Sequence, residues 1–371
     1  MKKILYIVST LSRSGPTNQL YNLVKYLNKE QFTPYLISLS PEPSNSRQDD
    51  FSALGVKMYN LELSRVKGIF FAKGKVKALI KSIEPDVIHT QGIRADVIAS
   101  KIDCSTIKVC TIHNHPQQDY LMRYGNILGS LMLKKHLGAL QHFNKCIGVS
   151  SAVEKNLSHL DGRIKTDSII NGVDTSLFSP ESSIEKQNLR RKLSLPENAV
   201  IWIVSGHLSP LKDPLFLIKS WRNKFPSNNH NILLFIGNGS LYAKCQSLTQ
   251  GASNIILKGR VNNVVEFLQA SDYFISASHS EGLPMAVIEA LACNLPVLLS
   301  DINPHLEILS MSENIGNSFR LGDFLSFSNS MDALLKENKS ILNQSIESLV
   351  NLRLNAEIMS KKYQSIYLSH L

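Results

Sequence analysis

The feature that most constrains the fold is a repeated alternation of short apolar runs with segments of helical length. Helical patterns at 17–28, 74–83 and 95–101 separate the runs of the first half of the chain. Those runs are residues 4–8, 35–39, 56–59, 87–89, 108–112 and 146–149. Continuous apolar strands that alternate with helices are typical of a parallel sheet covered on both faces.

The alternation then starts again. The second set of apolar runs covers residues 200–205, 232–236, 255–257, 273–276 and 297–299. An Asn-Gly-Val-Asp segment at 171–174 and a polar stretch at 179–187 lie between the two sets. We therefore predict two doubly wound α/β domains, 1–173 and 174–355, facing each other across a cleft. The pattern of the last segment, 342–371, predicts helix, and we expect 356–371 to pack back on the N-terminal domain. Ligands of such sheets bind outside the carboxyl ends of the strands, so the loops there are where function is expected.

Composition excludes several other classes of protein. The chain has 371 residues, 43% hydrophobic and 19% charged, which is ordinary for a globular protein and excludes disorder. No apolar stretch of about 18 residues is present, so no membrane-spanning helix is expected. The apolar run after the first lysines is too short for a signal peptide. Five scattered cysteines without a Cys-x-x-Cys spacing favour a reducing cytoplasm over a disulfide framework or zinc site.

The net positive charge of the chain comes entirely from its first half. Residues 1–173 hold 23 basic and 13 acidic side chains, whereas residues 174–371 hold 17 of each. The basic residues concentrate at 65–81 and 122–145, where they alternate with bulky apolar ones. This pattern suits an anionic membrane surface or another polyanion, and it equally suits a solvated helix face over an ordinary core. No recognition motif accompanies the charge, so nucleic acid is not expected as a partner.

Three loops after expected strands carry glycine or lysine. Gly15 precedes a helix start, where a backbone can approach an anion closely, although any capped helix looks the same. Gly237 opens a Gly-Asn-Gly turn, but Tyr242 stands where a dinucleotide fingerprint needs glycine, which disfavours a nicotinamide enzyme. Lys212 is placed to meet a phosphate, or it is a surface lysine beside the helix cap Asp213.

The most informative segment is Ser-His-Ser-Glu-Gly-Leu-Pro-Met, which leads into an apolar helix at 285–293. Every residue of that helix except Glu289 is apolar, so the helix is expected to be buried. A buried carboxylate needs a partner, because burying an unpaired charge costs many kcal/mol. Glu281 lies in the loop just before the helix. The two acids therefore form a functional pair, or Glu289 is a structural residue held by an Arg or by backbone.

The pair Glu281 and Glu289, set in Glu-Gly-Leu-Pro-Met, resembles the signature of the retaining GT-B glycosyltransferases of family 4, the group 1 glycosyl transferases. Further segments resemble the same family in order along the chain. They are Ser14-Gly15 before an Asn-Leu helix, 170–174, 206–212, 237–239 and 259–261. The resemblance implies the GT-B fold, which consists of two Rossmann-like domains.

The resemblance also implies roles for donor-binding residues. Glu289 matches the position that binds the ribose of a nucleotide-sugar, and Glu281 the position that contacts the donor sugar. Lys212 would neutralise the diphosphate, with a larger share than usual because His207 stands where the family commonly has Arg. Gly15 would let the N-terminal loop close on the donor. The remaining expected donor contacts are Gly237, Arg260 and Val261 near the base, and the amides of Gly282, Leu283, Met285 and Ala286.

For catalysis, the resemblance names His113, after the strand 108–112, as the histidine beside the reacting sugar; an assignment to His115 stays open. Lys212 and Glu281 complete the expected catalytic set, Glu281 without a nucleophilic role. Fixed donors would stabilise the nucleoside diphosphate as it leaves. No Asp-x-Asp motif occurs, so no metal and no cofactor is expected, the nucleotide-sugar being a substrate. Retention would follow from front-face attack, with the donor phosphate taking the acceptor proton.

The function expected by analogy is transfer of a hexose from a UDP-sugar to a glycan or lipid-linked glycan in bacterial surface polysaccharide synthesis. The enzyme would be cytoplasmic, or peripheral at the inner face of the plasma membrane. Two alternatives remain at this stage. One is a GT-B nucleotide-sugar epimerase, which would turn over the donor without an acceptor. The other is a non-catalytic module that binds a sugar or a membrane.

Overall fold

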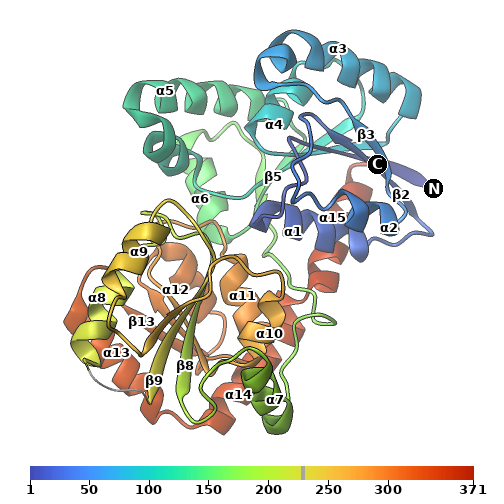
Figure 1. Cartoon of the computed structure of the whole chain (residues 1–371). Helices are drawn as coiled ribbons and strands as arrows, with labels where there is room; N and C mark the ends of the chain where they lie inside the picture. Colours follow the sequence, from blue (N-terminus) through green and yellow to red (C-terminus); the bar gives the residue numbers. More distant parts are fainter. Residues whose placement is uncertain (227–229) are drawn as a thin grey trace. The chain divides into compact units, whose positions relative to one another are not determined.

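The computed structural model describes residues 1–226 and 230–371 of the chain. The chain forms two compact units (Figure 1). The N-terminal unit consists of Met1–Gly172 together with Ala356–Leu371, and the C-terminal unit of Val173–Asn355. Each unit is an α/β domain built on one parallel sheet.

The N-terminal unit has a seven-stranded sheet in the order β3-β2-β1-β4-β5-β6-β7, and all its strand pairs are parallel. Its strands are β1 (Lys2–Val8), β2 (Phe32–Ser38), β3 (Lys57–Asn60), β4 (Val87–Gln91), β5 (Ile107–Ile112), β6 (Lys145–Gly148) and β7 (Thr166–Ser168). The central strands β1 and β4 are buried because helices cover both of their faces; β1 is an apolar run, whereas β4 also buries His89, Thr90 and Gln91. β7 was not expected, since its Thr-Asp-Ser sequence has no apolar run.

Helices cover both faces of this sheet. They are α1 (Gly15–Lys25), α2 (Gln48–Ala53), α3 (Arg65–Ile83), α4 (Ile93–Ser100), α5 (Pro116–Leu140), α6 (Ser151–Leu160) and α15 (Ala356–Ser369). On one face α4 packs against both α3 and α5, and on the other α1 packs against α15 (Figure 1). α3 begins nine residues before the expected helix at 74–83. Its start is fixed by Ser64, whose hydroxyl accepts from the Lys67 amide at 3.2 Å.

The C-terminal helix α15 completes the core of the N-terminal unit. Its Met359, Tyr363 and Tyr367 are buried with side chains of β1 and β4. The Tyr367 hydroxyl lies 2.6 Å from His89 Nδ1, and His89 Nε2 lies 2.8 Å from the Thr111 hydroxyl. These bonds satisfy polar groups that are entirely inside the protein, where a lost partner costs free energy.

The C-terminal unit has a six-stranded sheet in the order β10-β9-β8-β11-β12-β13, also parallel throughout. Its strands are β8 (Val200–Ser205), β9 (Asn231–Ile236), β10 (Ile255–Leu257), β11 (Tyr273–Ser276), β12 (Val297–Ser300) and β13 (Gly316–Phe319). The order of both sheets makes the two units doubly wound Rossmann-like domains. β13, with the sequence Gly-Asn-Ser-Phe, lacks the apolar run that identified the other five.

The helices of this unit are α7 (Ser183–Lys192), α8 (Pro214–Lys224), α9 (Tyr242–Leu248), α10 (Val264–Gln269), α11 (Met285–Ala292), α12 (Asn303–Leu309), α13 (Phe324–Lys336) and α14 (Lys339–Leu349). A π-helical turn, Val350–Leu354, follows α14. The segment 342–371 is therefore not one helix. It breaks at Asn355, which takes extended backbone angles, and the two parts belong to different units.

No helix within residues 1–226 and 230–371 has the length and apolar character needed to cross a membrane.

Candidate functional site

In the C-terminal unit two loops meet at the carboxyl ends of neighbouring strands. One loop, 206–213, follows β8, and the other, 277–284, follows β11, which pairs with β8. The His279 amide donates to the Leu211 carbonyl at 2.8 Å, and His279 Nε2 lies 3.1 Å from Asp213 Oδ2. Asp213 also caps α8, because its carboxylate accepts from the Phe216 amide. The two loops are thus held together as one structure.

Lys212 and Glu281 bridge these loops. Lys212 Nζ donates to Glu281 Oε1, and the Ser278 hydroxyl donates to the same oxygen at 2.7 Å. Burial acts to raise the pKa of the Glu281 carboxyl, but the charge of Lys212 and these hydrogen bonds outweigh it, so the pKa lies below its usual value. Glu281 is therefore a carboxylate near neutral pH, and Lys212 is a cation about 30% exposed.

The first turn of α11 faces the same hollow. Pro284, with extended backbone angles, precedes the helix rather than opening it, and seven of the eight residues Met285–Ala292 are buried. The first amides of a helix have no partner within it and attract anions. Pro284 and Ala286 line a small hollow of about 20 Å³ together with His207, Lys212 and Glu281. A cation and a helix N-terminus thus converge at one place, which is an arrangement suited to phosphate.

Glycine is required where the loops after β8 and β9 touch. A Cβ on Gly237 would lie 1.8 Å from the Gly206 carbonyl oxygen, and the φ of Gly237 is 136°. The Gly237 amide in turn donates to the Gly259 carbonyl at 2.7 Å, which joins the loop after β10 to the other two. The close approach of backbones explains the Gly-Asn-Gly turn without a dinucleotide ligand.

His305, in α12, is buried close to Glu281 and was not singled out by the sequence. Its Nδ1 lies 3.0 Å from both the carbonyl and the hydroxyl oxygen of Ser300, and the Ser300 hydroxyl donates to the Ser278 carbonyl at 2.7 Å. Burial lowers the pKa of His305 to about 4, so the ring is neutral near pH 7. Its Nε2 has no hydrogen-bond partner among the described residues. The rule that ligands gather at carboxyl ends of strands would have pointed to the loop after β12.

Glu289 is buried in the middle of α11, as the sequence predicted, with 9% of its surface exposed. Its carboxylate acts electrostatically on the thiol of Cys293, which lies one turn further along the helix. Burial, with Glu289 and Glu181 nearby, raises the pKa of the Cys293 thiol to about 12. The thiol therefore stays protonated.

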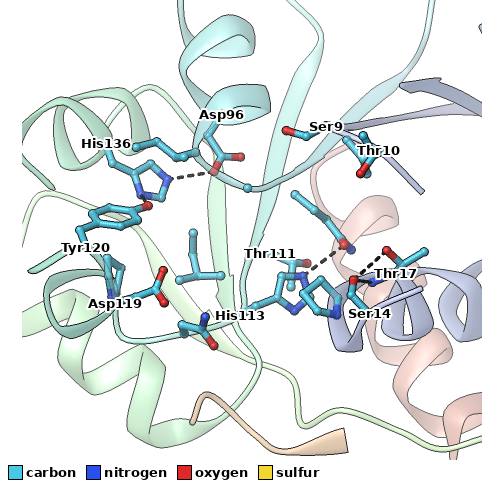
Figure 2. Close-up of a pocket in the computed structure, with 18 of the residues that line it drawn as sticks. Ser9, Thr10, Ser14, Thr17, Asp96, Thr111, His113, Asp119, Tyr120 and His136 are labelled. Carbon is cyan, nitrogen blue, oxygen red and sulfur yellow. Dashed lines mark hydrogen bonds and ion pairs between the residues drawn. The ribbon is translucent and has the colours of Figure 1, made fainter. Parts of the chain in front are cut away.

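The N-terminal unit contains a larger cavity of about 310 Å³ (Figure 2). It is lined from the loop after β1, from α1 and from α5, together with the ends of β4 and β5. Its polar lining includes Ser14, Gln91, Asp96, His113 and Asp119. The size and the mixture of hydroxyl, amide and carboxyl groups suit a sugar ring.

His113 follows β5 and lies in this cavity, where Figure 2 shows it beside Thr111. The Gln91 amide nitrogen donates to Gln19 Oε1 at 2.9 Å, which leaves Gln91 Oε1 to accept from His113 Nε2 at 3.1 Å. The proton of the neutral ring is thereby assigned to Nε2 and the lone pair to Nδ1. Burial lowers the pKa of His113 to about 4. Gln91 was missed because the predicted strand stopped at residue 89, whereas β4 continues to Gln91 at its carboxyl end.

A second buried network borders the cavity and was also missed. His136 Nε2 donates to Asp96 Oδ2 at 2.9 Å, and the Tyr120 hydroxyl lies 2.7 Å from His136 Nδ1 (Figure 2). Gly125 has a φ of 73° and interrupts α5 between Tyr120 and His136. The network therefore ties the two halves of α5 to α4. No sequence signal marked His136, because two lysines precede it in a helix that is not uniformly apolar.

Two family models match the chain, one on each unit. The group described as Glycosyl transferases group 1 matches residues 185–357, and Glycosyltransferase Family 4 matches residues 13–177. The chain belongs to glycosyltransferase family 4. This confirms the family predicted from the Glu281 and Glu289 pair and the accompanying segments.

Individual relatives agree with this. The O-antigen biosynthesis glycosyltransferase WclY of Escherichia coli is 23% identical over 98% of both chains. A UDP-Gal:alpha-D-GlcNAc-diphosphoundecaprenol alpha-1,3-galactosyltransferase of Escherichia coli is 31% identical over 45% of this chain and 44% of its own. The crystal structure of Anabaena Alr3699/HepE in complex with UDP and glucose has a TM-score of 0.83 at 16% identity, covering all of both chains. This likeness confirms the GT-B fold.

The structure of this glycosyltransferase brings some of the expected donor residues together. His207, Lys212, Glu281 and Ala286 line one hollow, and the other predicted residues do not line it. Those outside are Gly237, Arg260, Val261, Gly282, Leu283, Met285 and Glu289. In the N-terminal unit Ser14 and Pro16 line the cavity, whereas Gly15, the first residue of α1, does not line it.

Proposed function

We propose that this glycosyltransferase moves a hexose from a UDP-sugar to a glycan or lipid-linked glycan during assembly of a bacterial surface polysaccharide. The observation that carries the donor assignment is the bridge between Lys212 and Glu281 beside the N-terminus of α11. The names of WclY and of the diphosphoundecaprenol-dependent galactosyltransferase support the pathway and acceptor class. The HepE structure with UDP supports the choice of base.

In this proposal the C-terminal unit binds the donor. Lys212 and the first amides of α11 hold the diphosphate, which becomes more negative as the glycosidic bond breaks. Fixed charges aimed at the leaving group lower the barrier because they need no reorganisation during the reaction. Glu281 accepts from hydroxyls of the donor sugar, and Glu289 from the ribose. The Gly237 and Arg260 loops, joined through the Gly237 amide, border the base.

The N-terminal unit binds the acceptor in its cavity of about 310 Å³. His113, neutral and with its lone pair on Nδ1, accepts a hydrogen bond from a sugar hydroxyl. Front-face attack on the donor, with the phosphate taking the acceptor proton, retains the anomeric configuration. We propose that the reaction needs no metal. Within the described residues no group of three or more His, Cys, Asp or Glu is arranged to hold a metal ion.

We also propose that the enzyme works in the cytoplasm at the inner face of the plasma membrane, where lipid-linked acceptors are found. The acceptor class is tested by supplying the enzyme with a UDP-sugar and a polyprenyl diphosphate-linked glycan. Product formation with this acceptor supports the proposed acceptor class, and activity that EDTA leaves unchanged supports a reaction without a metal. The anomeric configuration of the product tests retention.

The donor site is tested by thermal shift with UDP, GDP, ADP and their sugars. A ligand that binds the folded state raises the melting temperature by mass action. We expect a shift with UDP that Glu289→Ala and Lys212→Ala abolish and the surface variant Lys244→Ala retains. The proposed site is wrong if both site variants keep the shift and full transferase activity. Donor turnover without any acceptor would instead indicate an epimerase.

A further inference from the structure

Helix α3 carries large apolar side chains that do not pack into the hydrophobic core of the N-terminal unit. The residues it buries against the unit are Gly68, Ala72, Val76, Ile80 and Ile83, at helical spacing along one face. Ile69 is 77% exposed, Phe70 73% and Phe71 59%. The expectation of an ordinary core beneath solvated lysines therefore fails at these positions, because three bulky residues in a row face outward.

The charge on α3 has one sign. The helix contains six basic side chains and no acidic one: Arg65, Lys67, Lys73, Lys75, Lys77 and Lys81. None of the six forms an ion pair among the residues that the structure describes. Lys67, Phe70, Gly74, Lys77 and Lys81 recur at intervals of three and four, so cations and apolar groups share the outward face.

Helix α5 repeats this combination on the same side of the sheet (Figure 1). Beyond its interruption at Gly125, Ile127 is 83% exposed, Leu128 53% and Leu131 61%. Lys134 and Lys135 follow and are exposed as well. α4 packs between α3 and α5, which places both helices on one face of the N-terminal unit.

We propose that this face docks on a bilayer that contains acidic phospholipids. We call it the α3–α5 surface and define it by Ile69, Phe70, Phe71, Ile127, Leu128 and Leu131 with the lysines around them. Apolar side chains of this kind enter the boundary between headgroups and acyl chains, and each lysine near an anionic surface adds about 1 kcal/mol. Exposed apolar patches on soluble proteins mark interaction sites.

The composition favours a membrane over the other occupants. Interfaces between proteins are depleted of lysine, whereas α3 alone has five. Proteins that bind single-stranded nucleic acid present aromatic side chains on which bases stack, whereas four of the six apolar residues here are aliphatic. Arg123 and Tyr124 of α5 also line the cavity of the N-terminal unit. Docking would then hold that cavity at the membrane, an argument that rests on the proposed function.

The test is co-sedimentation of the full chain with vesicles of phosphatidylcholine alone and of equal parts phosphatidylcholine and phosphatidylglycerol. We expect binding to the anionic vesicles that weakens as salt is added. The variants Phe70→Ser/Phe71→Ser and Lys73→Glu/Lys77→Glu should each bind at least tenfold more weakly. Ile184→Ser and Lys336→Glu, at exposed positions of the C-terminal unit, are the matched controls and should bind like the parent.

A fluorescence reporter distinguishes insertion from surface attraction. The two native tryptophans, Trp202 and Trp221, are fully buried, so Phe70→Trp adds the one exposed indole. Its emission should shift to shorter wavelength with anionic vesicles and remain unchanged with soluble polyglutamate.

Three results would overturn the proposal. They are vesicle binding that the Phe70/Phe71 variant retains, a reporter that responds equally to polyglutamate, and self-association that this variant abolishes in the absence of vesicle binding. An unchanged melting temperature and UDP shift show that each variant is folded. The assay needs neither donor nor acceptor, so its failure leaves the proposed transfer reaction intact.

Discussion

Lys212 donates to Glu281 across two loops that follow neighbouring strands. The cation expected to meet a diphosphate is therefore paired with the carboxylate expected to contact the donor sugar. Removing either partner leaves the other charge without its counterpart in a site where Glu281 is only about 11% exposed. We therefore expect the pair to contribute to both stability and activity, which experiments can separate.

Lys212→Met should reduce kcat/KM by roughly 10²–10³-fold, the size found when one charge-stabilising donor is removed from an active site. The double variant Lys212→Met/Glu281→Gln should recover melting temperature, because no unpaired carboxylate remains, but not activity. Steady-state kinetics and thermal unfolding of both variants measure this, with Lys244→Met in α9 as the control. Recovery of activity in the double variant would assign the pair a purely structural role.

Gly237→Ala should destabilise the C-terminal unit and abolish donor binding, because the new Cβ would lie 1.8 Å from the Gly206 carbonyl oxygen. Gly251→Ala is the matched control. Its φ is also positive, at 75°, but a Cβ at this position would have no neighbouring atom within 4 Å among the described residues. The control should cost only the conformational penalty of about 1–2 kcal/mol, and Gly237→Ala a further ~1–3 kcal/mol of crowding. Equal losses of unfolding free energy in the two variants would refute the close-packing explanation.

Tyr367→Phe should weaken the attachment of α15 to the sheet of the N-terminal unit. The hydroxyl that lies 2.6 Å from His89 Nδ1 would be lost, leaving a fully buried ring nitrogen unsatisfied. Such a loss costs about 1–3 kcal/mol. Hydrogen exchange at the amides of β4 and α15 should become faster, whereas Tyr124→Phe, at an exposed site, should leave it unchanged. Unchanged exchange in Tyr367→Phe would mean that this bond contributes nothing to stability.

The stability of the C-terminal unit should fall as the pH drops from about 6.5 toward 4. His305 has its pKa lowered to about 4 by burial, against 6.5 when unperturbed. Between these values the unfolded chain binds a proton that the folded unit excludes, so acid favours unfolding, by an amount on the order of 3 kcal/mol for the full shift. Both tryptophans belong to this unit, so urea unfolding followed by tryptophan fluorescence reports on it. His305→Gln should flatten the pH dependence; an equally steep profile in that variant would assign it to other groups.

Most of the strands, and their order along the chain, could be predicted from the sequence. Eleven of the thirteen strands in the described part of the chain were identified because buried parallel strands are continuous apolar runs. β7 and β13 were missed since short edge strands with polar residues lack that signal. The helix start at Arg65 was missed as well, because it depends on one serine cap rather than on apolar periodicity.

The sites were predicted unevenly. Lys212 and Glu281 could be named because each follows an expected strand and matches a family position. His305, Gln91 and His136 carry no motif. Gln91 contacts Gln19 and His113, and His136 contacts Asp96, which are all far away in the chain. Such partnerships form only when the strands align, so a linear pattern does not contain them.

The sequence by itself determined the α/β class, the family and the chemical groups of the loops after β8 and β11, because apolar periodicity and short motifs are local properties of the chain. Only the tertiary structure decided which side chains meet and which face outward. It paired Lys212 with Glu281, buried His305 beside them, and left Ile69, Phe70 and Phe71 exposed on a helix whose opposite face fills the core. The physical reason is that burial depends on which face of a helix meets the sheet, and the contacts between distant segments fix that face.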